Sequence, residues 1–245
     1  MNPSDEGTPP RHAQDLHRAA EALSGLSRDS CSDDADLSLQ MLVTLAARLV
    51  SGNASTSVTL LRHGHFRTVA ASSTEATDVD ALQYDLRTGP CVDAVLEGST
   101  FLTGDLEHEE RWQPLGRRLS AELGVRSMLA FRLHLLDETE TIAALNFSSH
   151  ELDAFTCADV DLGMLLATQC AFLVTASQAQ QKADNLFKAL ESNREIGVAV
   201  GVLMARYGLS RTQAFDVLRL ASQHSNRKLR DVAAEVSDTG LAPAT

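Results

Sequence analysis

The chain lacks long apolar runs, and this absence argues against a membrane protein. No run of about 18 or more uncharged apolar residues occurs in the 245 residues, so we expect no membrane-spanning helix. The first residues, Met1 to Pro10, are polar and acidic and contain no apolar segment of the kind that signal peptides carry. We therefore expect a cytoplasmic protein.

Paired cysteines and clustered histidines are missing as well. The sequence has four widely spaced cysteines with no Cys-x-x-Cys pair: Cys31, Cys91, Cys157 and Cys170. No histidines stand at zinc-ligand spacing, so neither a disulfide framework nor structural zinc is expected. His63 and His65 flank Gly64 and could hold a metal, but a hairpin tip is the more common interpretation. We predict no metal site, and the residues name no cofactor.

Positive charge is scarce overall but concentrated near the end of the chain. The formal net charge is −12, with 21 Lys and Arg against 33 Asp and Glu. One segment opposes Asp216 with six cations: Arg206, Arg211, Arg219, Arg227, Lys228 and Arg230. A basic island on an acidic protein suits a polyanion such as a nucleic acid. A solvated helix face is the plainer alternative.

The same segment has the pattern of three short helices. Apolar residues recur at helical spacing in three sets: Ile196, Ala199, Val200 and Leu203; Ala214, Val217, Leu218 and Ala221; and Leu229, Val232, Ala233 and Val236. Gly208 stands where a helix would end, and Ser210 with Gln213 has the spacing of a capping box. We expect Asn226 to be the N-cap of the third helix.

Three motifs in these helices resemble the ANTAR domain, an RNA-binding antitermination module. They are Ala199-x-Gly201-x-Leu203-Met204, Ala214-Phe215-x-x-Leu218-Arg219-x-x-Ser222 and Asn226-x-Lys228-Leu229-x-x-Val232-Ala233. The resemblance implies that dimeric or ligand-switched proteins bind a pair of small stem-loops in nascent transcripts and prevent a terminator from forming. Many members carry Lys before the glycine, where this chain has Val200. We therefore place the RNA contacts at Arg206, Arg219, Ser222, Asn226, Arg227 and Lys228.

The preceding residues predict an α+β domain with an antiparallel sheet. After a disordered start and a helix from Arg11 to Leu26, we expect the following elements: helix 37–50, hairpin strands 57–62 and 66–71, helices 78–84 and 91–97, strand 100–103, helix 111–123, and strands 126–135 and 141–148 around an acidic turn at Asp137-Glu138.

Several motifs in this part resemble a GAF domain of the kind joined to ANTAR. They are Gln83-Tyr84, Gly89-Pro90-Cys91-x-x-Ala94, Asp105 with Arg111-Trp112, Gly124-Val125-Arg126-Ser127 and Ala144-Leu145-Asn146-Phe147. The resemblance implies a sensor with a ligand pocket, for which Tyr84, Cys91 and Trp112 are the candidate residues. Cys91 is either a redox-sensing or ligand-sensing thiol near a helix N-terminus or a small buried residue. Tyr84 and Trp112 either stack on a flat ligand or belong to the core. The Asn-Lys-Phe-Asp-Glu signature of cyclic-nucleotide-binding GAF domains is absent.

A long helix is expected to connect the two parts. Thr156 and Asp159 have the spacing of a helix cap. Further along, apolar residues fall in a heptad pattern, with Leu166, Leu173 and Phe187 at one position and Ala176, Ala183 and Leu190 at the other. The alternative is a helix that ends near Ala176, followed by a loose polar linker.

The overall prediction is an α+β, GAF-type antiparallel sheet with flanking helices, followed by a long connecting helix and a three-helix ANTAR module. We divide the chain into a disordered or partly helical extension (1–36), a GAF sensor (37–176), a helical connector (177–191) and an RNA-binding ANTAR domain (192–240).

The leading hypothesis is a non-catalytic, homodimeric regulator in which a small-molecule or redox signal at the sensor controls binding of paired RNA stem-loops. Two alternatives stay open. The C-terminal helices could form a helix-turn-helix that binds DNA, or the GAF fold could act as a cysteine-dependent sulfoxide reductase.

Overall fold

The computed structural model describes residues 35–136 and 141–243. The chain divides into two compact units, Met1–Gln178 and Ala179–Thr245. The expected helix from Arg11 to Leu26 and the acidic turn at Asp137-Glu138 lie outside the described residues.

The first unit is built on a five-stranded antiparallel sheet with the strand order β2-β1-β5-β4-β3. Its strands are β1 (Ser55–Arg62), β2 (His65–Ala71), β3 (Phe101–Thr103), β4 (Ser127–Leu133) and β5 (Thr141–Ser149). The turn between β1 and β2 places His63 at φ 50° and Gly64 at φ 78°. Two residues with positive φ match the twist of a tight hairpin, so the hairpin-tip interpretation of this pair is confirmed.

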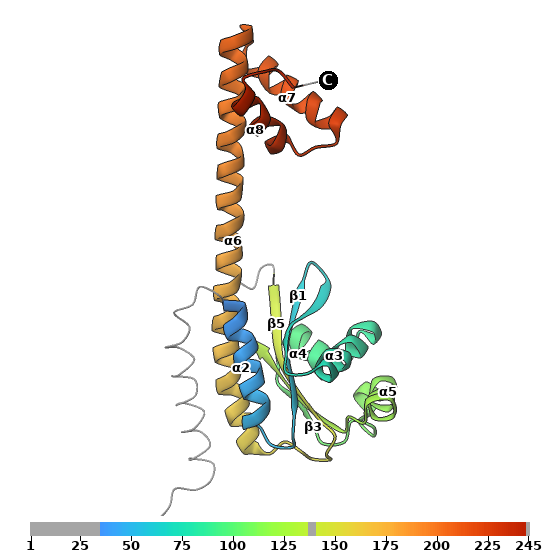
Figure 1. Cartoon of the computed structure of the whole chain (residues 1–245). Helices are drawn as coiled ribbons and strands as arrows, with labels where there is room; N and C mark the ends of the chain where they lie inside the picture. Colours follow the sequence, from blue (N-terminus) through green and yellow to red (C-terminus); the bar gives the residue numbers. More distant parts are fainter. Residues whose placement is uncertain (1–34, 137–140, 244–245) are drawn as a thin grey trace, which may run out of the picture. The chain divides into compact units, whose positions relative to one another are not determined.

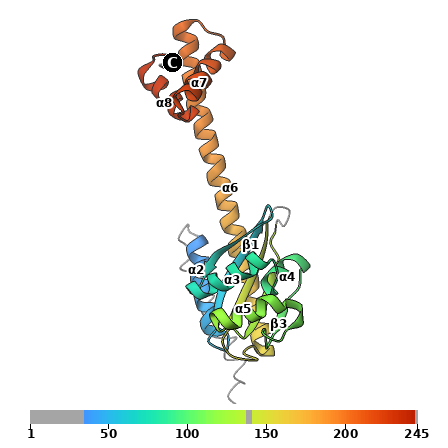
Figure 2. The ribbon, with the colours of Figure 1, turned by 90° about the vertical axis from the view of Figure 1, so that its right-hand side faces the viewer.

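Helices cover both faces of the sheet. One face carries α2 (Ala35–Leu49) and the beginning of α6, and the other carries α3 (Thr74–Leu86), α4 (Pro90–Glu97) and α5 (Gln113–Leu123) (Figures 1 and 2). A 3-10 turn, Glu110–Trp112, leads into α5. The α2 and α6 side holds the larger apolar core, which includes Leu42, Phe131 and Leu166. The predicted α+β class and antiparallel sheet are confirmed.

The start of α4 depends on a glycine. Gly89 has φ 129°, and a Cβ atom there would lie 2.5 Å from Oε1 of Gln83 and from Leu115. Pro90 follows as the first helical residue, where its missing N–H is no loss. The expected helix start at Gly89-Pro90 is confirmed, and it places Cys91 in the first turn.

The helix α6 runs without interruption from Cys157 to Tyr207, a length of 51 residues. At its start, Oδ2 of Asp159 accepts a hydrogen bond from the Thr156 amide at 2.8 Å, and the Asp159 amide donates to the Thr156 hydroxyl at 3.3 Å. These reciprocal bonds satisfy amides that lack helical partners. The continuous helix is confirmed, and the loose-linker alternative is wrong.

The expected heptad register on α6 is wrong in its first half. Leu166 is fully buried in the core of the first unit, and Leu173 packs against the same core. Their neighbours one residue earlier, Leu165 and Phe172, are 50% and 67% exposed instead. The physical reason is that this part of α6 packs its apolar face against the sheet of the first unit. The residues on that face are buried there and are not exposed for pairing with a second helix.

One 18-residue window of α6 has a mean hydropathy of 1.5, which by length and composition would suffice for a membrane span. In that window 44% of the residues are buried inside the protein. The core helix of a water-soluble protein passes the same test, so this window is weak evidence for a membrane.

Candidate functional site

The second unit is a small helical module around one apolar core. The last part of α6 is followed by α7 (Arg211–Ser225) and α8 (Leu229–Thr239). All three helices contribute fully or nearly buried side chains: Ala199, Val200 and Leu203; Ala214, Leu218 and Ala221; and Val232, Ala233 and Val236. They are nine of the twelve residues of the predicted stripes, and the other three, Ile196, Val217 and Leu229, are partly buried against them, so the three-helix prediction is confirmed.

The turns of this module are set by local hydrogen bonds. Gly208 follows α6 with φ 63°. Ser210 accepts a bond from the Gln213 amide at 3.3 Å, and the Gln213 side chain accepts one from the Ser210 amide at 2.9 Å. The predicted capping box is therefore present.

Asn226 was expected to cap the third helix, and this prediction is wrong. Asn226 instead closes α7 in the left-handed conformation, with φ 51° and ψ 32°. The N-cap of α8 is Lys228, whose extended backbone leads into Leu229 and whose side chain makes no capping bond. Asparagine tolerates the left-handed region better than most residues, which suits it to a helix C-terminus. The corner between α7 and α8, residues 226–228, thus has a tight turn and a cation at the start of α8.

Most cations of the predicted RNA surface have an internal partner but remain half-exposed. Arg219 pairs with Asp216 at 3.2 Å, and the two side chains are 49% and 48% exposed. Arg227 pairs with Glu235 at 2.6 Å, with exposures of 48% and 47%. Exposed pairs of this kind contribute little and exchange readily with other anions.

The other predicted RNA-contact residues differ in whether their side chains already have a hydrogen-bond partner within the protein. Arg206 donates to the carbonyl oxygen of Gly240 at 2.9 Å. Ser222 donates to the carbonyl oxygen of Arg227 at 2.6 Å, so its hydroxyl is engaged within the corner. The Lys228 side chain is exposed and has no hydrogen bond or ion pair within residues 35–136 and 141–243.

Val200 occupies the position at which many members of the ANTAR family have Lys. Its side chain is 6% exposed and lies in the apolar core of this module. An aliphatic side chain suits this buried environment, whereas an unpaired ammonium would carry a desolvation cost. The structure therefore offers no cation at this position for a phosphate contact.

The first unit holds a buried polar cluster between the sheet and α3. The carboxylate of Asp80, fully buried, accepts hydrogen bonds from Thr68 at 2.7 Å, Thr59 at 3.4 Å and Asn146 at 3.3 Å. The Tyr84 hydroxyl lies 2.7 Å from Thr59 Oγ1 and 2.9 Å from Thr68 Oγ1. Burial raises the pKa of Asp80 to about 6, although the hydroxyl donors act in the opposite direction.

Two of the pocket candidates border this cluster. Cys91 is fully buried, and its thiol lies 3.2 Å from Thr59 Oγ1. Burial, and next the charge of Asp80, raise the pKa of Cys91 and also that of Tyr84. A thiol in such a place is mostly protonated and poorly nucleophilic, so the environment favours the small-buried-residue interpretation of Cys91.

Trp112, the third pocket candidate, lies in a different core cluster with Leu106 and Leu115. It is 1% exposed, and its indole N–H donates to Asp93 at 2.6 Å. The guanidinium of Arg111 lies 4.3 Å from the centre of its ring. The structure thus brings Tyr84 and Cys91 together but places Trp112 apart.

Sequence reasoning missed the centre of the buried cluster. Asp80 follows Ala76 and Val79 at helical spacing, on the buried face of α3. Two features of the sequence could have identified Asp80. It is a carboxylate at a core position of an amphipathic helix, and hydroxyl residues alternate along a predicted strand that could face it.

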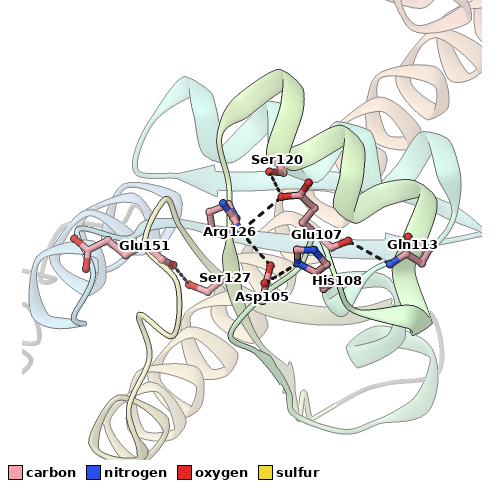
Figure 3. Close-up of polar contacts among 8 residues, drawn as sticks. All are labelled: Asp105, Glu107, His108, Gln113, Ser120, Arg126, Ser127 and Glu151. Carbon is pink, nitrogen blue, oxygen red and sulfur yellow. Dashed lines mark hydrogen bonds and ion pairs between the residues drawn. The ribbon is translucent and has the colours of Figure 1, made fainter.

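A second polar cluster surrounds Arg126, near the start of β4 (Figure 3). Arg126 lies 3.4 Å from Asp105 and 3.6 Å from Glu107. His108 bonds Asp105 at 2.8 Å, and this bond, ahead of Arg126, lowers the pKa of the Asp105 carboxyl. These contacts fasten the segment after β3 to the residues that lead into β4.

Among the open cavities of the first unit, two are lined entirely by residues that the structure describes. One of about 420 Å³ is polar and is lined by Arg48, Ser73, Glu75 and His150 among others. The other, of about 340 Å³, is mainly apolar and lies between α6 and β4, with Phe131, Met164 and Phe172 in its lining. Both have the volume of a small-ligand site.

Comparisons with known proteins identify both parts of the chain. Residues 34–175 match the family model for the GAF domain, and residues 184–236 match the family model for the ANTAR domain. No curated protein matches the sequence at a significant level.

Solved structures resemble the first unit. The GAF domain from a phosphoenolpyruvate-protein phosphotransferase of Coxiella burnetii has a TM-score of 0.52 at 13% identity, covering 71% of this chain and 99% of that one. The corresponding GAF domain from Acinetobacter has a TM-score of 0.50 at 14% identity, covering 71% and 99%. The free methionine-R-sulfoxide reductase from Neisseria meningitidis, in complex with its substrate, has a TM-score of 0.48 at 14% identity, covering 71% and 96%. At such identities, the two phosphotransferase domains support the fold alone.

Proposed function

Because the chain belongs to the GAF domain family and carries an ANTAR domain behind its GAF domain, we propose that it is a cytoplasmic, RNA-binding transcription antitermination regulator. The sensor occupies residues 37–176, a helical connector residues 177–191, and the RNA-binding module residues 192–240. A signal at the sensor controls whether the module binds paired stem-loops in a nascent transcript. Bound stem-loops would keep a terminator from forming.

The observation that supports RNA binding best is the corner between α7 and α8. Lys228, exposed and without a partner in the described residues, stands at the N-terminus of α8, where free backbone amides and the helix dipole favour an anion. Arg227 and Arg219 add half-exposed cations whose partners are exposed carboxylates. Such a corner suits a phosphate of an RNA loop.

Dimerisation is supported by an exposed seam on α6. We define the α6 seam as two sets of four residues in which each residue follows the previous one by seven positions. The first set is Leu165, Phe172, Ala179 and Leu186, and the second is Gln169, Ala176, Ala183 and Leu190. Its large members are exposed, with Leu186 at 62% and Leu190 at 58%. Apolar residues that alternate at three-residue and four-residue spacing are typical of a two-stranded coiled coil. Two modules held together in this way would bind a two-stem target with a gain in effective concentration.

The reductase alternative lacks support from the cysteines that the structure describes. Cys91 and Cys170 are fully buried, and burial raises the pKa of both thiols. Cys157 is exposed at the start of α6. A cysteine-dependent reduction needs an accessible thiolate with a nearby resolving thiol.

The function is tested by crosslinking the full-length protein to RNA in cells and sequencing the bound fragments. We expect enrichment of paired hairpins close to terminators. The enriched pair is then synthesised and competed against duplex DNA of equal length for the purified protein. Preference for the duplex would favour the helix-turn-helix alternative, and the absence of any hairpin enrichment would contradict the proposal.

The site is tested by the double variant Arg219→Ala and Lys228→Ala. We expect RNA affinity to fall by at least tenfold, since charge-assisted contacts contribute about 1.5 to 3 kcal/mol each. The double variant Arg117→Ala and Arg118→Ala, at two exposed positions of α5, provides a control with the same charge change in the first unit. Unchanged affinity in the double variant would place the RNA elsewhere.

A further inference from the structure

An aromatic side chain stands between two arginines on the exposed side of α7. Arg211, Phe215 and Arg219 follow one another at four-residue intervals, so they lie on the same side of the helix, each about 6 Å along the axis from the next. Phe215 is 40% exposed, and both arginines are exposed. Ser222 and Asn226 continue the same side towards the corner between α7 and α8.

Phe215 does not belong to the buried core of the module. The buried face of α7 consists of Ala214, Leu218 and Ala221, and Val217 packs against them. The largest apolar side chain of the helix therefore lies outside the cluster that holds the module together. Exposing a phenyl ring to water has a free-energy cost that a solvated helix face would avoid.

A second exposed apolar residue of α7, Leu220, does not have the flanking arginines that Phe215 has. Leu220 is 45% exposed. Its neighbours at four-residue spacing are Asp216 and His224 rather than arginines. Exposure alone is thus common on this helix, whereas an aromatic ring with a cation one turn away on each side occurs only at Phe215 within α7.

The cations beside Phe215 are available for an anion. The Arg211 side chain makes no hydrogen bond or ion pair in the part of the chain that the structure describes. Arg219 has only the exposed pair with Asp216. An aromatic ring flanked by cations is the combination that holds an unpaired nucleotide, because the base stacks on the ring and the phosphates on either side contact the cations.

We propose that Phe215 is a stacking platform for an unpaired base of the RNA hairpin loop, with Arg211 and Arg219 contacting the phosphates that flank this base. The platform rests on the proposed RNA-binding function. It extends the predicted contacts by two residues and gives the module a means to select loop bases over a paired stem, whose bases already stack on one another.

The test uses the full-length protein and a tandem-hairpin RNA from the crosslinking experiment, with 2-aminopurine placed at each loop position in turn. Stacking on a ring changes the fluorescence of this base analogue. We expect one loop position to respond to wild-type protein. Phe215→Leu should abolish that response and weaken binding by about tenfold, the range for loss of one stacked base.

Three further variants make the result specific. Phe215→Tyr keeps an aromatic ring and should retain the response and most of the affinity, even if Phe215→Leu folds poorly. Leu220→Ala removes the other exposed apolar residue and should leave both unchanged. Arg211→Ala should weaken binding without removing the fluorescence response.

The outcomes separate the platform from the function on which it rests. Wild-type protein that binds no hairpin would overturn both. Hairpin binding that is equal in wild type and Phe215→Leu would overturn the platform alone. If Phe215→Leu changes the sedimentation of the protein without RNA, the ring covers another copy of the chain and the platform is wrong.

Discussion

The hydroxyl of Ser222 donates a 2.6 Å hydrogen bond to the carbonyl oxygen of Arg227. This bond spans the turn between α7 and α8, and the Arg227 amide bonds back to the carbonyl oxygen of Ser222 at 3.2 Å. Ser222 is therefore a positioning residue. It fixes the backbone that presents Arg227 and Lys228, although its own hydroxyl is not free for RNA.

Replacing Ser222 with Ala should loosen this corner. We expect the free energy of unfolding to fall by about 1 kcal/mol, the net contribution of a typical hydrogen bond, and RNA affinity to fall several-fold because Lys228 is less well placed. Ser225→Ala is a matched control, since the Ser225 hydroxyl bonds to Ala221 within α7 at 2.6 Å. Equal loss of RNA affinity in both variants, measured by titration, would show that the corner bond has no special role.

Arg219 offers a test of the electrostatic part of the interface. Asp216 holds its guanidinium at 3.2 Å. Asp216→Asn should release Arg219 and increase RNA affinity several-fold at low salt, with a smaller effect at high salt. Arg219→Ala should reduce the slope of log affinity against log salt by about one unit, as expected for one phosphate contact. An unchanged slope in Arg219→Ala would remove this residue from the interface.

Asp80 gives the first unit a distinct pH dependence. Its pKa in the folded protein, about 6, lies above the ordinary value of 3.8. Between these values the folded state holds a proton that the unfolded chain has released, so this group favours folding below pH 4 and the contribution is lost as the pH rises through 6. Over that window we expect a loss on the order of 3 kcal/mol.

Asp80→Asn should remove this loss because the amide does not ionise. We expect the free energy of unfolding to change less between pH 4 and pH 7 in the variant than in wild type. Urea titrations followed by the fluorescence of Trp112, the sole tryptophan, report on this unit. Asp85→Asn, at an exposed position of the same helix, should behave as wild type. Equal pH dependence in all three proteins would contradict a buried, proton-binding Asp80.

The order and type of the elements could be predicted because local signals and fold agree. Hydrophobic periodicity located the helices, and the His63-Gly64 turn and the Ser210 capping box both depend on residues within one short segment. Gly89 and Pro90 likewise determine the start of α4 from their own backbone restrictions.

The sequence-based predictions were wrong where a residue is compatible with more than one structural position. Asn226 fits both ends of a helix, and only the three-dimensional turn decides that it closes α7. Leu166 fits a heptad pattern, but in the structure its side chain is buried in the core against the sheet of its own unit. The polar cluster around Asp80 joins α3 to β1, β2 and β5, and no local pattern shows such a long-range meeting.

The three cysteines that the structure describes should differ sharply in reactivity. Cys157 is exposed, whereas Cys91 and Cys170 are fully buried, and burial raises the pKa of Cys170 to about 12. In the folded protein iodoacetamide should modify Cys157, and it should reach the other two only after addition of urea. Peptide mass spectrometry assigns each site separately. Modification of Cys91 as fast as Cys157 would restore the redox-sensor hypothesis.

The α6 seam predicts which residues hold two copies together. Leu186 and Leu190 belong to the seam, whereas Phe187, 77% exposed, belongs to the register that Leu166 and Leu173 exclude. Leu186→Ser with Leu190→Ser should shift the dimer to monomer in sedimentation velocity, because polar residues at seam positions remove the apolar contact. Phe187→Ser should have a clearly smaller effect. A larger effect of Phe187→Ser would restore the other register, and a monomeric wild type at all concentrations would remove the dimer.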